Sequence, residues 1–410
     1  MRIKHLTSIF LIFLLTVLPL FSEPVPEKPY VILISFDGFR WDYVNRGISP
    51  NLEYLAQEGV SASSLQPSFP TKTFPNHYTI VTGLYPENHG IIYNDFINPF
   101  TGEQFKIGDT TQIRNPKWYL GEALWETAER QGVVSASYFW PGSEIKLDYR
   151  RPTYVEYYDE ARPYPERVQG VLAWFDLPAE KRPNFITLYF DATDTEGHKY
   201  GPDAPETNAA IKKLDSTLGL LIRGLRKREM LKSVNILVVS DHGMTAIDAK
   251  KIINIEQILS GHAMQIQGYG PVMMVNASDK ELPVIYQLIK KHEKNFRVYR
   301  KSYLPVYYHF SHNPFIPPLI LIADPGWSLV DNKISANLDA YLTGGNHGYD
   351  NHFLDMHGIF YAMGPAFKKG YSTGTLRNID IYPLICNILK IEPNQEIDGN
   401  LERIEFILQE

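Results

Sequence analysis

The segment from Pro70 to Tyr78 combines a hydroxyl group with the features of a helix start. It ends a polar loop and opens an apolar run, and Thr73 stands just before Pro75, a residue that suits the first helical turn. The free N–H groups and the dipole at a helix N-terminus favour an oxyanion, so Thr73 is a candidate nucleophile. Taken alone, a threonine at this place is more often a plain N-cap. The assignment therefore depends on the residues that accompany it.

Three apolar segments of the chain each lead into an aspartate. Their unbroken apolar and small-residue composition is typical of buried parallel strands. The segments are Val31–Phe36, Phe185–Phe190 and Asn235–Ser240, and the aspartates are Asp37, Asp194 and Asp241. Two of the aspartates have a histidine nearby, His198 and His242. Because the carboxyl ends of parallel strands meet at one edge of a sheet, this layout predicts a metal site there.

The first Asp–His pair has helical spacing. Asp194 and His198 are four residues apart, which in a helical turn puts both side chains on one face. Gly197 argues against a regular helix, although a tight turn would serve as well. A surface Asp–His pair is the competing interpretation for these two residues alone.

The second pair is adjacent in the sequence. Asp241 and His242 would face opposite sides of a strand, so both reach one ion only if the strand has ended, which Gly243 permits. Asp37 could equally be a helix N-cap. Three aspartates placed alike favour the interpretation as metal ligands.

A further ligand is expected from the histidine-rich segment between Gly344 and His357. It contains His347, His352 and His357, and their spacing does not choose among them.

Several long motifs resemble the nucleotide pyrophosphatase/phosphodiesterase family, within the alkaline-phosphatase superfamily. They follow the family's order along the chain and are Thr71–Tyr78, Thr82–Asn94 and Ser240–Met244. The resemblance runs from Tyr30 to about Pro383. It implies an alkaline-phosphatase-like α/β fold and a hydrolase that uses two metal ions.

The resemblance also implies the ligand set of each ion. The His-Gly-x-Asp-Asn pattern selects His347 and leaves His352 and His357, like His77 and His89, as loop or core histidines. One ion would be held by Asp194, His198 and His347, and the other by Asp37, Asp241, His242 and the Thr73 oxygen. Nitrogen and carboxylate ligands without a thiolate suit Zn²⁺, with Mn²⁺ or Co²⁺ as other occupants.

In the mechanism implied by the resemblance, Thr73 attacks phosphorus and forms a phosphothreonyl intermediate, which water then releases. Asn94 matches the family position that donates a hydrogen bond to a non-bridging phosphate oxygen. A neutral donor suits a diester, whereas a monoesterase would profit from an arginine or a third metal ion. The expected activity is therefore hydrolysis of nucleotide pyrophosphate and phosphodiester bonds, with release of nucleoside 5′-monophosphates.

Four aromatic residues resemble the nucleobase pocket of the nucleotide-cleaving members. They are Phe74, Trp140, Tyr158 and Tyr189. Core packing is the competing interpretation for each one, and Tyr157 could substitute for Tyr158. One departure from the family concerns Ile113 and Arg114, which stand where the nucleotide enzymes carry a lysine near the base.

Two other functions compete with this one. A phosphodiesterase for choline- or glycerol-type phosphodiesters would replace the base slot with acidic or aromatic cation-binding residues. A non-catalytic binding protein of the same fold would lack a ligand or the nucleophile, and neither is missing from the sequence.

The elements that must position these residues alternate along the chain. The predicted strands are Val31–Phe36, Val133–Phe139, Phe185–Phe190, Val234–Ser240, Val272–Val275, Leu319–Ala323 and Ile359–Met363, and the predicted helices are Asn51–Gln57, Trp118–Arg130, Pro165–Phe175, Ala204–Arg228, Glu281–Lys291 and Ile379–Leu389. This alternation predicts an α/β fold with a mostly parallel central sheet and helices on both faces. One catalytic domain is expected over 23–410, with an irregular insertion near 141–163 and a small lobe near 261–312.

Composition limits the partners and the location. The 410 residues carry a formal charge of −6, which predicts a small-molecule substrate and no nucleic-acid-binding surface. A basic start followed by the apolar stretch from Leu6 to Phe21 predicts a signal peptide over 1–22, with an uncleaved anchor as the alternative. Cys386 is the only cysteine, so no intrachain disulfide forms. An exported protein without disulfides indicates a bacterial periplasm or exterior, with no further membrane segment and no protein partner implied.

Overall fold

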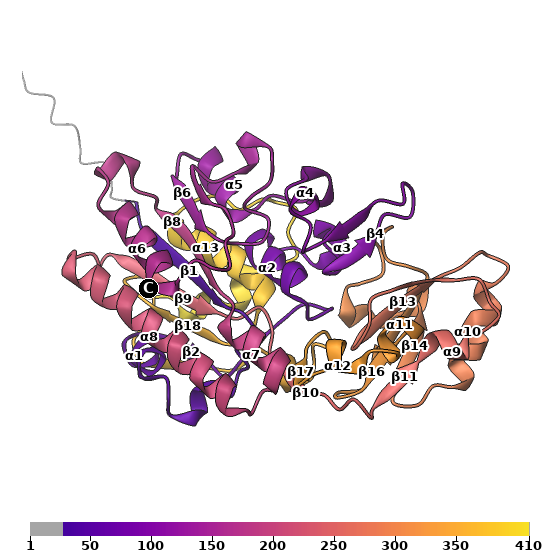
Figure 1. Cartoon of the computed structure of the whole chain (residues 1–410). Helices are drawn as coiled ribbons and strands as arrows, with labels where there is room; N and C mark the ends of the chain where they lie inside the picture. The colour runs from indigo at the N-terminus through magenta and orange to yellow at the C-terminus, as the bar shows by residue number, and fades with distance from the viewer. Residues whose placement is uncertain (1–27, 410) are drawn as a thin grey trace, which may run out of the picture.

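The computed structural model describes residues 28–409, and the segment expected to be a signal peptide lies outside the described residues (Figure 1). Its centre is an eight-stranded sheet. In order across the sheet the strands are β19 (Tyr371–Thr373), β2 (Val60–Ala62), β18 (Phe360–Met363), β9 (Val234–Val239), β1 (Tyr30–Phe36), β8 (Phe185–Phe190), β6 (Ser135–Tyr138) and β7 (Tyr154–Glu156). Within this sheet β18 alone runs antiparallel to its neighbours, so the expected mostly parallel sheet is confirmed.

Helices cover both faces of this sheet because its strands are apolar on both sides. Along β1, Val31 and Leu33 belong to one hydrophobic core, whereas Ile32 and Ile34 belong to the other. The first core includes side chains of α2 (Thr73–Thr82), α5 (Leu124–Arg130) and α13 (Ile381–Leu389). The second includes those of α1 (Pro50–Glu58), α6 (Tyr164–Phe175) and α8 (Pro205–Lys227). Figure 1 shows these helix groups on either side of the strands.

One predicted helix begins later than expected. The interval Trp118–Arg130 contains only α5, which starts at Leu124, after a 3₁₀ helix at Pro116–Trp118 and an extended segment. The reason is Gly121, whose φ of 77° lies in the left-handed region and interrupts any right-handed helix. Gly197 argues against a regular helix in the sequence, but this argument is wrong, because α7 spans Ala192–Tyr200.

The insertion near 141–163 contributes to the sheet itself. Its strand β7 pairs in parallel with β6 and forms one edge of the main sheet. The rest of the segment contains a short 3₁₀ helix, Asp148–Arg150, and loops.

A smaller lobe is inserted between β9 and β18 and lies at the right of Figure 1. Its antiparallel sheet has the order β12 (Gln265–Gln267), β13 (Val272–Asn276), β15 (Leu319–Ala323) and β14 (Phe296–Arg300). Beside it lie the parallel pair β11 (Ile252–Asn254) and β16 (Ser328–Val330) and the helices α9 (Ile255–Ile258), α10 (Leu282–Lys291), α11 (Asn332–Ser335) and α12 (Leu338–Tyr341). The lobe thus has its own sheet and its own core, and it extends beyond 261–312 on both sides.

Short elements complete the described chain. They are β3 (Leu65–Gln66) with β20 (Leu376–Arg377), the hairpin of β4 (Asp95–Ile97) and β5 (Gln104–Lys106), the pair β10 (Thr245–Ala246) and β17 (Gly345–Asn346), and the helices α3 (Pro86–His89) and α4 (Thr110–Ile113). None of the helices in the described part of the chain is long and apolar enough to span a bilayer.

Candidate active site

The three aspartates meet at the carboxyl edge of the main sheet. Asp37 follows β1 directly, and the Gly38 N–H donates to Asp241 Oδ1 at 3.2 Å. A Cβ atom at Gly38 would lie 2.9 Å from the Asp194 Cα, and the φ of Gly38 is 63°. Only glycine therefore lets the chain turn so close to α7. This turn brings Asp37, Asp194 and Asp241 together from three separate strand ends.

Helix α7 presents Asp194 and His198 on one face. His198 Nε2 lies 3.4 Å from Asp194 Oδ1. Gly197 lies between them in the helix and packs against the Met244 side chain, which a Cβ atom would approach to 3.1 Å. The lack of a side chain at Gly197 thus allows α7 to pack closely against Met244.

The second Asp–His pair also reaches a common point. Strand β9 ends at Val239, so Asp241 and His242 lie in the turn that follows. Both side chains are buried, and His242 Nε2 lies 3.0 Å from Asp241 Oδ2 and 3.4 Å from Asp37 Oδ1.

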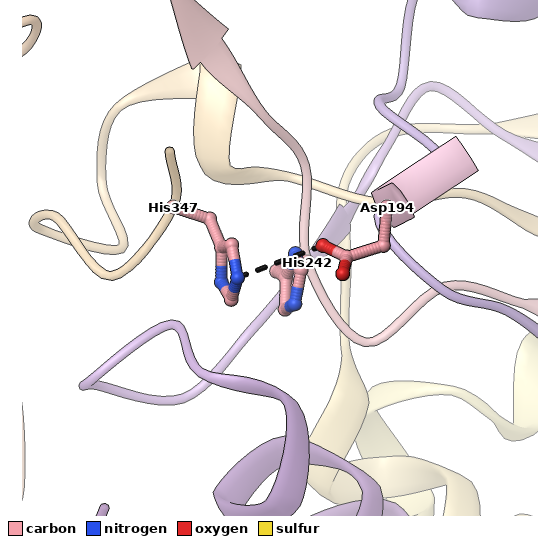
Figure 2. Close-up of side chains that lie close together, drawn as sticks. All are labelled: Asp194, His242 and His347. Carbon is pink, nitrogen blue, oxygen red and sulfur yellow. Dashed lines mark ion pairs between the residues drawn. The ribbon is translucent and has the colours of Figure 1, made fainter. Parts of the chain in front are cut away.

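His347 is brought to the same place by the β10–β17 pair. Thr245 pairs with Asn346, and this pairing holds the segment after His242 beside the segment before His347. The two imidazole rings stack with centroids 3.5 Å apart. Asp194, His242 and His347 form one tight group, shown in Figure 2, and Asp37, Asp241 and His242 form another. His242 belongs to both groups, and His198 lies beside the first.

The histidines are oriented as metal ligands are. Nδ1 of His198 donates to Gly345 O at 3.0 Å, Nδ1 of His242 to Gly243 O at 2.8 Å, and Nδ1 of His347 to Thr71 O at 2.7 Å. When such a ring is neutral, its lone pair is therefore on Nε2. The Nε2 atoms of His198 and His347 are only 3.1 Å apart, an arrangement that a shared cation stabilises.

The carboxylates of the cluster also have oxygen atoms that are left for a cation. Asp37 Oδ1, Asp194 Oδ1 and Asp241 Oδ2 are buried and have no hydrogen-bond partner among the described residues. Buried anionic oxygens are costly unless a cation or a donor faces them. These residues therefore fit divalent ions well.

Electrostatics supports the same conclusion. Burial raises the pKa of Asp37 well above its ordinary value, and the carboxylates of Asp241 and Asp194 raise it further. Burial also acts to raise the pKa of Asp241, but His242 and His77 outweigh it and lower that pKa. Burial and the nearby positive groups, His242 first, lower the pKa of His347 well below its ordinary value, which keeps this ring neutral and able to bind a metal.

Thr73 occupies the position that its motif predicts. It is the first residue of α2, and its Oγ1 lies 3.3 Å from His242 Nε2. Asn94 is close by, because its Oδ1 accepts the Phe74 N–H at 3.0 Å. This bond fixes the amide, and among the described residues the Asn94 Nδ2 group has no acceptor, so it can donate to a substrate.

A cavity of about 230 Å³ opens next to Thr73. We call it the aromatic cavity, because Phe74, Trp140, Tyr158 and Tyr189 all line it. Asp37 and Asp194 form part of its wall. The structure therefore brings the four expected aromatic residues together beside the candidate nucleophile.

Two contacts of this site were not predicted from the sequence, one made by the Tyr189 hydroxyl and one by His77. The Tyr189 hydroxyl donates to Asp37 Oδ2 at 2.6 Å, and His77 Nδ1 lies 2.9 Å from Thr73 O and 3.3 Å from Asp241 Oδ2. His77 thus touches the Asp241 carboxylate, whereas His352 and His357 bond to loop atoms and His89 to atoms of the α2–α3 region. The spacing of four between Thr73 and His77 was the available signal.

The cavity wall holds another missed residue, Glu144. Arg114 pairs with Glu144 at 2.7 Å, and the Tyr158 N–H donates to it at 2.6 Å. This carboxylate is therefore already satisfied by the protein. Ile113 also lines the cavity, so the departure from the family pattern at Ile113 and Arg114 places an apolar side chain in the cavity wall.

Comparisons with known proteins agree with this geometry. Residues 31–350 match the family model described as type I phosphodiesterase/nucleotide pyrophosphatase. Human ectonucleotide pyrophosphatase/phosphodiesterase family member 5 is 36% identical over 392 residues, which are 95% of this chain and 80% of that protein. The venom phosphodiesterase of Naja atra is 37% identical over 93% of this chain, which spans only 47% of the venom enzyme.

A solved structure extends the match to three dimensions. Murine ectonucleotide pyrophosphatase/phosphodiesterase 5 superimposes with a TM-score of 0.87 at 33% identity, covering 93% of this chain and 100% of that one. These matches define a hydrolase of phosphodiester and pyrophosphate bonds. The chain belongs to the type I phosphodiesterase/nucleotide pyrophosphatase family.

Proposed function

We propose that this enzyme hydrolyses nucleotide pyrophosphate and phosphodiester bonds through a phosphothreonyl intermediate on Thr73 and releases nucleoside 5′-monophosphates. One observation carries the proposal: Thr73 lies between a cluster of unpartnered buried carboxylate oxygens and the aromatic cavity. A nucleophile in this position attacks a phosphorus atom whose nucleoside half occupies that cavity. The murine relative supports it, since that protein was solved as an inactive threonine-to-alanine variant in complex with AMP.

Each residue has a stated role in this proposal. Asp194, His198 and His347 would hold one divalent ion, and Asp37, Asp241, His242 and the Thr73 oxygen the other, with Zn²⁺ favoured by the ligand types. Such ions lower the pKa of a bound hydroxyl and neutralise charge on the phosphoryl group. Asn94 donates through Nδ2 to a non-bridging oxygen, and Phe74, Trp140, Tyr158 and Tyr189 contact the base. Stacking on such rings contributes about 1–3 kcal/mol per base.

The competing choline-type diesterase is weakened by the charge of the aromatic cavity. Its aromatic rings could face a choline cation as well as a base, so the rings alone do not separate the two substrate classes. Glu144 is the carboxylate of this cavity outside the aspartate cluster, and it is already paired with Arg114.

We propose that the enzyme is located in the bacterial periplasm or exterior. The relatives are named as ectoenzymes and venom enzymes, and these names support export in general.

Thr73→Ala tests the nucleophile. We expect the variant to retain its bound metal and to lose turnover of ATP by at least about 10³-fold, as losses of nucleophiles do. Metal analysis and steady-state kinetics measure the two effects, and Thr73→Ser, which keeps a hydroxyl, is the matched control. The wild-type products should be AMP and pyrophosphate. Near-normal turnover by Thr73→Ala, or formation of ADP and phosphate, would contradict the mechanism.

A further inference from the structure

A second and larger cavity adjoins the candidate active site and shares the lining residue Ile107 with the aromatic cavity. Its volume is about 600 Å³, within the range of roughly 300–1,000 Å³ that is typical of small-molecule sites. We call it the lysine cavity, because Lys72, Lys106 and Lys333 line it. Its walls come from the β4–β5 hairpin, from the lobe and from the segment around His347.

The two cavities touch different parts of the ligand cluster. Asp37, Asp194 and Thr73 line the aromatic cavity, whereas His198 and His347, the two histidines expected to share an ion with Asp194, line the lysine cavity. In the proposed function the Thr73 oxygen binds the ion held by Asp37, Asp241 and His242, and its hydroxyl lies 3.3 Å from His242 Nε2. An in-line displacement places the leaving oxygen opposite the attacking oxygen. The leaving half of the substrate therefore departs on the side of His198 and His347, where the lysine cavity begins.

The lysines of this cavity are available for an anion. Among the described residues, neither Lys106 nor Lys333 has a carboxylate within ion-pair distance, and neither side chain donates a hydrogen bond. Buried Lys72 donates to His347 O at 2.7 Å and to Asn346 Oδ1 at 3.3 Å, which leaves its third N–H group.

Two acidic residues of the same wall are engaged locally. Asp331 Oδ1 accepts the Ile334 N–H at 2.7 Å and caps α11, and Asp95 Oδ1 accepts the Gln104 amide at 2.5 Å. Asp95 lies opposite Lys106 in the hairpin, yet the two form no ion pair. The cavity thus offers three ammonium groups against two carboxylates that already hold other partners.

We infer that the lysine cavity receives the leaving half of the substrate and favours anionic, phosphate-containing leaving groups, with Lys106 and Lys333 as specificity-determining residues. The inference rests on the proposed function. In the step concerned, Thr73 gives up its hydroxyl proton to water, the bond from Thr73 Oγ1 to phosphorus forms while the bond from phosphorus to the leaving oxygen breaks, and the leaving half takes that electron pair. Pyrophosphate or a nucleoside polyphosphate then departs among the lysines, whose positive charge attracts the negative charge of the leaving group.

The test compares leaving groups of different charge. Lys106→Ala, Lys333→Ala and the double variant are assayed with ATP, which loses pyrophosphate, and with the 4-nitrophenyl ester of thymidine 5′-monophosphate, which loses nitrophenolate. We expect kcat/KM for ATP to fall about two- to fivefold in each single variant and roughly tenfold in the double variant, as exposed charge pairs of this kind contribute. The ester should react at the wild-type rate.

Two controls separate charge from structure. Lys333→Arg keeps the charge and should retain most of the activity on ATP, and Lys291→Ala removes an exposed lysine of α10, on the lobe but outside the cavity. The ATP preference of the wild type should also shrink as salt is added, because screening weakens exposed charge pairs.

The outcomes distinguish the inference from the proposed function. If the variants lose both substrates equally, or lose neither, the lysine cavity does not select the leaving group and the inference is wrong, although the wild type still hydrolyses both. If the wild type hydrolyses neither substrate, the proposed function and the inference fail together.

Discussion

Tyr189 faces two environments with one side chain. Its ring lines the aromatic cavity, as the resemblance to nucleotide-cleaving enzymes led us to expect, while its hydroxyl donates to the buried carboxylate of Asp37. A residue that orients a metal-binding carboxylate affects every substrate alike, whereas a residue that only contacts the base affects nucleotides. We therefore expect Tyr189 to act as a positioning residue as well as a contact for the base.

Tyr189→Phe isolates the hydroxyl. The ring remains in the cavity, but Asp37 loses its donor, so we expect metal affinity to fall about 10- to 100-fold, as it does when partners of metal ligands are removed. The loss of kcat at limiting metal should be equal for ATP and for bis-4-nitrophenyl phosphate. Titration with Zn²⁺ measures the affinity.

Tyr158→Phe is the matched control for this experiment. Tyr158 lines the same cavity, and its hydroxyl bonds to none of the described residues, so its removal should leave metal affinity unchanged. Wild-type metal affinity in Tyr189→Phe would show that the bond to Asp37 has no role in positioning.

At the scale of elements, the turn after β9 is tightly packed against the segment around Asp355 and His357. A Cβ atom at Gly243 would lie 2.1 Å from the carbonyl oxygen of Asp355 and 2.8 Å from that of His357. These are backbone atoms, which cannot move aside as a flexible side chain can. The position of His242 therefore depends on the absence of a side chain at its neighbour.

Gly243→Ala should displace this turn. We expect an overpacking cost of about 1–3 kcal/mol and a loss of metal binding, because His242 moves with the turn. Thermal unfolding and metal content measure both effects. Gly374→Ala is the control, since a Cβ atom there meets no atom within 4 Å. A variant at Gly243 that melts and binds metal like the wild type would refute this account of the turn.

Some elements were predictable because their signal is local. The apolar run ending at Phe36 and the aspartate that follows it are adjacent in the sequence, so the strand and its carboxylate could be predicted together. Trp118–Arg130 has helical periodicity, but the positive φ of Gly121 that interrupts it follows from tertiary packing. The pairing of Thr245 with Asn346, which sets His347 beside His242, joins distant segments of only two residues each, and no local pattern marks them. For that reason the spacing alone could not choose among the three histidines.

At the scale of the whole molecule, the ligand cluster links four parts of the chain. Its members follow β1, β8, β9 and β17, so a bound ion joins segments that the sequence separates widely. Ions that bind the folded chain and not the unfolded chain raise its stability. The unpartnered carboxylate oxygens of Asp37, Asp194 and Asp241 make this contribution large, since without a cation they repel one another.

Removal of metal should therefore lower the melting temperature. At a free metal concentration of 1,000 times Kd the stabilisation is about 4 kcal/mol, which corresponds to a shift of several degrees. Scanning calorimetry with EDTA, and again after addition of Zn²⁺, measures the loss and its recovery. Asp37→Asn, which removes one ligand charge, should respond less to both treatments. Equal melting temperatures with and without EDTA would count against a metal site in this cluster.

The β10–β17 pair also joins the points where the chain leaves for the lobe and returns from it, and the Ile247 N–H donates to Gly344 O across this junction. An insertion whose two ends are neighbours tolerates changes of length and sequence with little effect on its host. Evolution can therefore graft a different lobe at this point while His242 and His347 stay in register. Because the lobe supplies part of the lysine cavity, an exchange of the lobe can change the substrate while the expected metal ligands and the nucleophile stay the same.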